Sequence, residues 1–235
     1  MKLSSGINVK KEISSEKIDV VTIDGPAGSG KSTVARAVAK SLDYTFLDTG
    51  AMYRAVALGA LNSNLRPEFD TNFNKFLENL DLSFQTSKQS MMIILDGRDV
   101  TQEIRRPDMG KWASDFSKLE AVRHFCSQKQ RDIGCNGKVV AEGRDMGTVV
   151  FPDAKWKFFL TATLEERAKR RWLEERSRKN NSNYERVREW MQRRDTQDSN
   201  RKLAPLKPAQ DARIIDTTDM QIHDVIIAIT SQIKK

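Results

Sequence analysis

The chain has 235 residues, of which 40 are Lys or Arg and 32 are Asp or Glu, so its formal charge at pH 7 is +8. This length suits one domain, or one domain carrying an insertion, and no stretch is apolar enough to span a bilayer. The two cysteines and two histidines lack metal-site spacing and suggest no disulfide framework, which excludes a zinc domain and a disulfide-stapled scaffold. We therefore expect a cytoplasmic protein with no membrane partner.

The amino-terminal segment is polar. Residues 1–17 lack the apolar block of a secretory signal, so we expect a polar tail followed by one domain over 18–235. The positive charge of the whole chain suits nucleic acid, a membrane surface or a phosphate-rich small molecule. Charge alone does not choose among these partners.

The first part of the domain alternates strands and helices. Residues 18–24 are a short β-branched run typical of a buried strand, and residues 32–42 carry apolar side chains at helical spacing. A second strand is predicted over 44–47 and a second helix over 51–61. This alternation is typical of a parallel sheet.

The pattern then changes to locally paired elements. A short helix is indicated by apolar residues between Phe73 and Leu80, and strands are predicted over 82–85 and 91–95. An Asp-Gly pair follows at Asp96 and favours a tight turn. Local strand pairs inside an α/β chain predict an inserted subdomain over 62–104.

The α/β pattern resumes after the insert. Pro107 suits a helix start, and apolar residues recur at helical spacing as far as Phe125, which predicts one core-facing helix. Further strands are predicted over 139–141, 156–160 and 213–216, with a last helix over 222–233. Together with the first two strands these elements predict an α/β fold with a doubly wound, five-stranded parallel sheet.

The turn after the first strand matches the complete phosphate-loop pattern G-x-x-x-x-G-K-[ST]. Its glycines allow successive backbone N–H groups to face phosphate oxygens, and the following helix adds its unpaired donors. Lys31 is expected to reach the β- and γ-phosphates, and Ser32 to place its hydroxyl on Mg²⁺. The residues predicted to hold ATP here are Gly25, Pro26, Ala27, Gly28, Ser29, Gly30, Lys31 and Ser32.

Polar segments follow the second and third predicted strands, where a parallel sheet opens its ligand crevice. Thr49 and Arg54 come after the second strand and should lie beside the phosphate loop. Glu142 precedes Arg144 and Asp145, in the position of an acidic segment that helps hold Mg²⁺. Arg144 is suited to an anionic acceptor, and Asp145 can orient that arginine or a metal-bound water.

Two charged helical segments complete the candidate site. A capping box at Thr163 starts a helix on which Arg167, Arg170 and Arg171 share a face. These arginines either pair with Glu174 and Glu175 on a solvated helix or close over ATP as a lid, which we place at 163–183. Further on, Arg194, Asp198 and Arg201 are spaced to share one helix face, as a salt-bridge ladder or as part of the crevice.

Four segments together resemble the bacterial cytidylate kinases: 25–33, 48–54, 143–152 and 194–206. The resemblance extends from about residue 18 to the carboxyl terminus. The run Gly-Arg-Asp-Met-Gly-Thr-Val-Val-Phe-Pro is far more specific than the phosphate loop. This resemblance implies transfer of a phosphoryl group from Mg²⁺-ATP to CMP or dCMP in pyrimidine nucleotide metabolism, by in-line transfer with charge stabilisation of the transition state.

The resemblance also implies roles for individual residues. It adds Thr33 to the ATP site and assigns Lys31, Arg144, Asp145 and Arg201 to catalysis. It also identifies the segment with Arg167, Arg170 and Arg171 as the family's lid and the 62–104 insert as its nucleotide-monophosphate-binding subdomain. Acceptor-phosphate residues are Thr49, Arg54, Arg144 and Arg201; base-reading residues are Ser114 and Arg123; sugar contacts are Arg194 and Asp198, with Asp145 nearby. The only metal-site residue assigned is Ser32.

Three positions depart from the usual family pattern. Thr49 stands where Ser is frequent and keeps the hydroxyl, and Ser32 replaces a frequent Gly, which supplies a direct hydroxyl for Mg²⁺. Glu142 stands where Asp is common, so the metal-water geometry of the family does not transfer directly to it.

Other functions remain open at this point. The chain could be another small-molecule kinase, a nucleic-acid-binding protein that uses its +8 charge, or a nucleotide sensor without turnover. Interleaved aromatic and basic residues, typical of RNA-binding sheets, are missing, which argues against nucleic acid. Intact Lys31 and Ser32 argue against the sensor. We expect a monomer, whose preference among CMP, dCMP and UMP the sequence leaves open.

Overall fold

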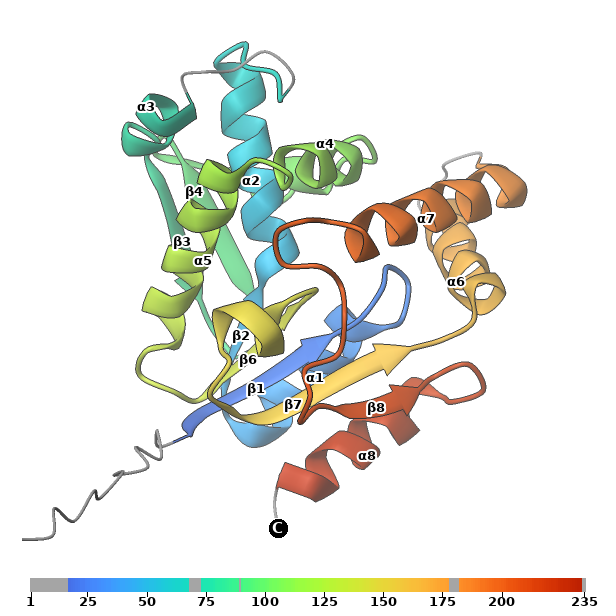
Figure 1. Ribbon diagram of the computed structural model, residues 1–235. Coiled ribbons are helices and arrows are strands. Elements are labelled where there is room, and N and C mark those ends of the chain that lie inside the picture. Colours follow the sequence, from blue (N-terminus) through green and yellow to red (C-terminus); the bar gives the residue numbers. More distant parts are fainter. Residues whose placement is uncertain (1–16, 68–72, 89, 178–181, 234–235) are drawn as a thin grey trace, which may run out of the picture.

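The computed structural model describes residues 17–67, 73–88, 90–177 and 182–233. Its main sheet contains five parallel strands in the order β2-β6-β1-β7-β8 (Figure 1). The predicted doubly wound sheet is therefore confirmed. Its strands are β1 (Ile18–Asp24), β2 (Thr45–Asp48), β6 (Val139–Gly143), β7 (Ala154–Thr161) and β8 (Arg213–Asp216).

Helices cover both faces of this sheet, which is why its central strands are apolar without alternation. On one face, Val21 and Ile23 of β1 pack in a core with α1 (Lys31–Leu42) and α8 (Ile222–Ile233). On the other face, Val20 joins a second core with α2 (Thr49–Asn62) and α5 (Glu120–Gly134). Each fully buried aliphatic side chain stabilises the fold by about 1.5–3 kcal/mol.

A second sheet of three antiparallel strands lies within the predicted insert: β3 (Leu82–Thr86), β4 (Met91–Leu95) and β5 (Arg98–Asp99). The sequence predicted only the first two. Asp96 and Gly97 have φ angles of 49° and 72° and form the two-residue turn that leads into β5. Because β5 is short and exposed, no apolar pattern marked it.

The insert shares its core with the main domain. Buried residues of β4 and of α3 (Phe73–Glu78) belong to the same apolar cluster as Leu47 of β2. In addition, the Phe46 backbone N–H donates to the Ser87 carbonyl at 3.0 Å. The small sheet is thus anchored beside β2.

The single helix predicted from Pro107 to Phe125 is wrong. The chain forms a short 3-10 turn, η1 (Glu103–Arg105), then α4 (Met109–Phe116), and α5 begins only at Glu120. Leu119 has extended backbone angles, and the Ser117 hydroxyl donates to the Ser114 carbonyl at 2.8 Å. A serine that binds its own backbone in this way competes with the helix and favours a break.

Two helices form a hairpin beside the phosphate loop (Figure 1): α6 (Leu164–Ser177) and α7 (Tyr184–Ser199). Half of the predicted capping box at the start of α6 is present: the Glu166 N–H donates to the Thr163 hydroxyl at 3.3 Å, whereas the Thr163 N–H donates to the Thr218 hydroxyl at 3.1 Å and not to Glu166. Ala168, Val187 and Met191 form a small separate core between the two helices.

Parts of the predicted units lie outside the described residues: 1–16 of the tail, 68–72 and 89 of the insert, and 178–181 of the lid. Their assignment as functional units stays a prediction. Within the described parts of the chain, no helix has both the length and the apolar character that a membrane span requires.

Candidate active site

The phosphate loop joins β1 to α1 and has a backbone that only glycine permits at two points. Gly25 has a φ of 147°, and a Cβ there would lie 2.0 Å from the Leu160 carbonyl oxygen. Gly28 has a φ of 74°, and its Cβ would meet the backbone of Arg167 at 2.9 Å. The backbone of Leu160 and of Arg167 therefore limits the conformation of the loop. The backbone amides of the loop lie at the start of α1.

Lys31 is buried at the base of this loop. Its Nζ donates to the Pro26 carbonyl at 2.6 Å and lies 3.4 Å from the Ser29 hydroxyl. Burial, together with the nearby Arg144, lowers the pKa of Lys31 to about 7. The ammonium group therefore has few compensating charges, and an incoming phosphate is the partner it lacks.

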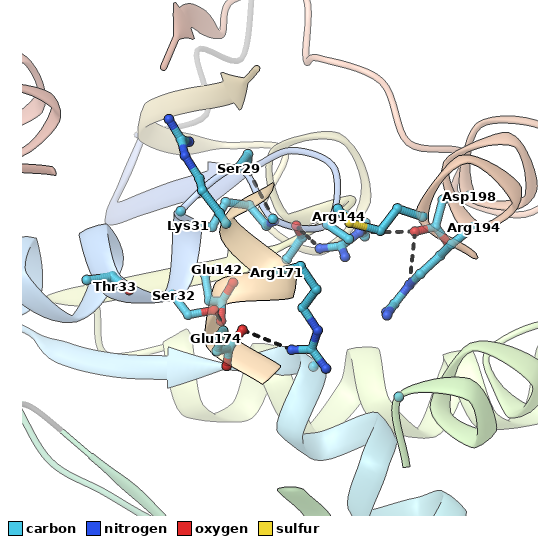
Figure 2. A pocket seen from close by; sticks show the side chains of 18 of the residues that line it. Ser29, Lys31, Ser32, Thr33, Glu142, Arg144, Arg171, Glu174, Arg194 and Asp198 are labelled. Carbon is cyan, nitrogen blue, oxygen red and sulfur yellow. Dashed lines mark hydrogen bonds and ion pairs between the residues drawn. The ribbon is translucent and has the colours of Figure 1, made fainter. Parts of the chain in front are cut away.

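Ser32, in the first turn of α1, meets Glu142 of β6. The Ser32 hydroxyl donates to Glu142 Oε1 at 2.5 Å (Figure 2). Burial and the neighbouring Asp48 raise the pKa of Glu142. A hydroxyl and a carboxylate are oxygen donors that suit Mg²⁺, which usually takes one or two protein ligands and completes its shell with phosphate and water.

The donor set therefore fits Mg²⁺ together with a bound phosphate. Among the described residues, no group of three or more His, Cys, Asp or Glu side chains is arranged as a metal site.

Asp198 is the centre of a cluster of arginines. Its carboxylate lies 3.1 Å from Arg144 Nε, 3.7 Å from Arg201 Nη1 and 4.0 Å from Arg194 Nε, and Figure 2 shows the first and last of these pairs. Burial alone would raise the pKa of Asp198, but the three arginines lower it by more. Arg201 is not on the helix as predicted, since α7 ends at Ser199, yet it turns back to Asp198.

A second buried pair lies on the α5 side of the cavity. Arg123 Nη2 is 2.5 Å from Asp145 Oδ2, and the Arg123 guanidinium stands 5.6 Å from the centre of the Tyr53 ring. Although burial disfavours the guanidinium charge, Asp145 raises the pKa of Arg123 overall. Ser114 on α4 lies on the same cavity, and its hydroxyl oxygen is 2.7 Å from Gln197 Nε2.

The start of α2 supplies a third group. The Thr49 hydroxyl donates to the Glu142 carbonyl at 2.7 Å, and Arg54 Nη2 lies 3.4 Å from Asp48 Oδ2. Arg105 of η1 also reaches Asp48, at 3.7 Å. Sequence reasoning missed Arg105 because it lies far along the chain from Asp48, just after the insert and outside any recognised motif; the adjacent arginines at 105 and 106 were the available signal.

Several buried donors in the cavity wall have no protein partner. Among the described residues, the Nε atoms of Arg54, Arg194 and Arg201 make no hydrogen bond. Burying an unpaired donor is costly unless a ligand supplies the acceptor. All three side chains line the cavity, so the wall is built for an anionic molecule.

The three predicted lid arginines have different environments. Arg167 is buried and donates to the Ala27 carbonyl at 3.1 Å and to Asp195 at 2.6 Å, and it does not line the cavity. Arg170 binds Glu166 and the Thr217 carbonyl. Arg171 lines the cavity while bound to acids of its own helix (Figure 2), Glu174 and Glu175.

One large cavity of about 1240 Å³ connects these groups. This volume exceeds the range of about 300–1,000 Å³ usual for a single drug-sized ligand, so it has room for two nucleotides. Gly25, Pro26 and Arg167 are the predicted site residues that do not line it. Those that do are Ala27, Gly28, Ser29, Gly30, Lys31, Ser32, Thr33, Thr49, Arg54, Ser114, Arg123, Arg144, Asp145, Arg170, Arg171, Arg194, Asp198 and Arg201.

The sequence predicted no role in the site for Asp24, the last residue of β1. Its carboxylate accepts hydrogen bonds from the backbone N–H groups of Met146 at 2.9 Å and Gly147 at 2.8 Å. These amides begin η2, a π-helical turn (Met146–Val150) that directly follows Asp145. Burial raises the pKa of Asp24 to about 7, although both N–H groups oppose the shift.

Comparison with known proteins gives a consistent result. The cytidylate kinase family model matches residues 21–235. The chain is 44% identical over 206 residues to a cytidylate kinase of Caldicellulosiruptor saccharolyticus, covering 88% of this chain and 91% of the relative. It is 45% identical to one of Carboxydothermus hydrogenoformans (88% and 93% covered) and 46% identical to one of Pseudothermotoga lettingae (88% and 90% covered).

The shifted pKa of Asp24 leads to a prediction about stability. Since the folded-state pKa is about 7 and an unfolded Asp has a pKa of about 3.9, this carboxyl contributes most stability below about pH 4. That contribution falls as the pH rises to about 7, by at most about 1.4 kcal/mol per pH unit. The free energy of unfolding of Asp24→Asn should therefore decrease less between pH 5 and 7 than that of the wild type.

Urea unfolding at a series of pH values measures this difference. The matched control is Asp224→Asn, which removes one carboxylate from the exposed side of α8. If Asp24→Asn and the wild type show parallel pH dependences, the assignment of a raised pKa to Asp24 is wrong.

Proposed function

From the premise that this chain belongs to the cytidylate kinase family, we propose that it transfers the γ-phosphoryl group of Mg²⁺-ATP to CMP and dCMP. The coarser activity follows from the family: the protein is an ATP-dependent nucleoside-monophosphate kinase acting on CMP-type nucleotides. The observation that carries the proposal is that one cavity joins the phosphate loop to the arginines around Asp198. We further propose that it acts as a monomer in pyrimidine nucleotide metabolism.

The donor side of the reaction belongs to the phosphate loop. The amides of the loop and the start of α1 bind the β- and γ-phosphates, and Lys31 exchanges the Pro26 carbonyl for a phosphate oxygen. Ser32 and Glu142 would hold Mg²⁺. When bound, the metal ion neutralises charge on the β- and γ-phosphate oxygens.

The acceptor side belongs to the arginine clusters. Thr49, Arg54, Arg144 and Arg201 bind the acceptor phosphate. Asp48 holds the guanidinium group of Arg54, and Asp198 holds those of Arg144 and Arg201. Arg194 and Asp198 then contact the sugar. Ser114 and Arg123 read the base, from the wall formed by α4 and α5, and Asp145 lies near the sugar contacts.

Catalysis in this arrangement rests on position and charge. In the transition state, the phosphoryl group is only weakly bonded to both oxygens and carries negative charge, so the protein has little covalent chemistry to perform. Holding the acceptor phosphate in line with the γ-phosphate can supply about 7–11 kcal/mol. Arg144 and Arg201 compensate the developing charge, Lys31 follows the migrating oxygens, and no side-chain nucleophile is required.

The segment 163–183 acts as a lid in this proposal, and 62–104 as the nucleotide-monophosphate-binding insert. Arg170 and Arg171 line the cavity and are bound to acids of α6, so ATP phosphates would compete with Glu166, Glu174 and Glu175 for them. Arg167 instead fastens α6 to the phosphate loop. Closure excludes water, which would otherwise take the phosphoryl group.

An acceptor panel tests the reaction. The protein is incubated with Mg²⁺-ATP and, separately, CMP, dCMP, UMP, AMP or shikimate, and ADP is measured. We expect turnover to be greatest with CMP and dCMP. Faster turnover with AMP or shikimate would contradict the proposed substrate. Tight oligonucleotide binding that weakens steeply with salt would support a nucleic-acid partner instead.

Lys31→Ala should lower kcat by orders of magnitude while CMP still binds, because the removed charge acts only on the donor phosphates. Steady-state kinetics give kcat, and calorimetric titration gives CMP affinity. Lys40→Ala, at the exposed end of α1, is the control for loss of one positive charge. Retained turnover in Lys31→Ala would remove the assigned role.

Asp198→Ala should raise the KM for CMP much more than the KM for ATP. Its loss releases Arg144, Arg194 and Arg201 from their common partner, all on the acceptor side of the cavity. An effect of about 10-fold or more is expected for removal of a buried charged partner. Equal changes in the two KM values would count against an acceptor contact.

A further inference from the structure

Gln197 lies on α7, one residue before Asp198, and reaches across to α4. Its Nε2 is 2.7 Å from the Ser114 hydroxyl oxygen and 3.4 Å from the Ser114 carbonyl oxygen. Because a carbonyl oxygen can only accept, the side of the Gln197 amide that faces Ser114 is the nitrogen. The Ser114 hydroxyl oxygen therefore receives a hydrogen bond from Gln197.

This hydrogen bond limits what the Ser114 hydroxyl can do. A serine hydroxyl has one hydrogen and two lone pairs, and a free one rotates its hydrogen to suit whichever partner is present. Once Gln197 occupies one lone pair, the Ser114 oxygen is held toward α7 and its hydrogen can take only the two remaining positions. A hydroxyl held in this way meets a ligand from one place in the cavity that it lines.

We propose that Gln197 is a positioning residue that sets the base specificity of the acceptor site by fixing the Ser114 hydroxyl. This inference rests on the proposed function, in which Ser114 reads the acceptor base. Cytosine and uracil differ at ring position 4, where an amino donor is replaced by a carbonyl acceptor, and at the adjacent ring nitrogen. A hydroxyl whose oxygen is held at one place meets only one part of the base edge, whereas a hydroxyl that is free to change rotamer can follow either base.

The position of Gln197 supports this role. It is half-buried, on the turn of α7 that also carries Arg194 and Asp198, so it connects the base-reading wall to the arginine cluster. Ser117 donates to the Ser114 carbonyl at 2.8 Å, so that carbonyl already has a short partner. The short contact of Gln197 is therefore the one to the hydroxyl.

Two isosteric variants remove the donor. Gln197→Leu has no polar group, and Gln197→Glu keeps the shape but presents only acceptors at neutral pH. In both, we expect the KM for CMP to rise about 5- to 10-fold, the effect of one hydrogen bond, while the KM for ATP changes less than about twofold. The ratio of kcat/KM for CMP to that for UMP should fall by a similar factor. Gln192→Leu, exposed on the same helix, should leave both values unchanged.

A double-mutant cycle separates positioning from a general structural effect. If Gln197 acts through Ser114, then Gln197→Leu should have little further effect on CMP in a Ser114→Ala background. Additive effects of the two changes would overturn the proposal, and so would wild-type discrimination in Gln197→Glu. An unchanged KM for ATP shows that each variant is folded.

Measurements on the wild-type protein distinguish a failure of the role proposed for Gln197 from a failure of the proposed function. If it prefers CMP to UMP and the Gln197 variants keep that preference, only the role of Gln197 is wrong. If the wild type shows no preference for CMP over the other acceptors, the proposed function and this inference fail together.

Discussion

The site depends on one constraint of the parallel sheet, which brings the carboxyl ends of β1, β2 and β6 to the same edge. The register pairs Asp24 with Gly143 and Asp48 with Glu142. Three buried carboxylates, those of Asp24, Asp48 and Glu142, therefore lie at the carboxyl ends of three neighbouring strands. Each needs its own compensation in a region of low dielectric. Asp24 takes two backbone amides, Asp48 takes two arginines, and Glu142 takes the hydroxyl of Ser32.

The buried arginines around Asp198 and Asp145 likewise need partners of opposite charge. A buried ion pair adds little stability, because desolvation offsets the attraction, but removal of either partner is severe. The pairs around Asp198 and Asp145 therefore explain little of the stability of the fold. What they do explain is that the arginine side chains are already in place in the cavity. They keep cationic groups folded inward in the absence of an anion, with some donor atoms still unpaired.

Local spacing explains which features the sequence predicted. The turn between β1 and α1, the five main strands and the N-cap at Thr163 depend on residues within one turn or one strand, and the structure confirms them. The helix break before Glu120 was missed because the Ser117 hydroxyl binds the Ser114 carbonyl in competition with the helical backbone, and the apolar spacing does not reveal this bond. Arg105 and Gln197 were missed because their partners, Asp48 and Ser114, lie 57 and 83 residues away along the chain.

The contact between the phosphate loop and the α6–α7 hairpin has a mechanical consequence. Gly28 lies against the Arg167 backbone and the Met191 side chain, while Arg167 binds the Ala27 carbonyl. Any swing of the hairpin toward the cavity must carry these contacts along or break them. Such a movement of the hairpin would therefore also deform the loop between β1 and α1.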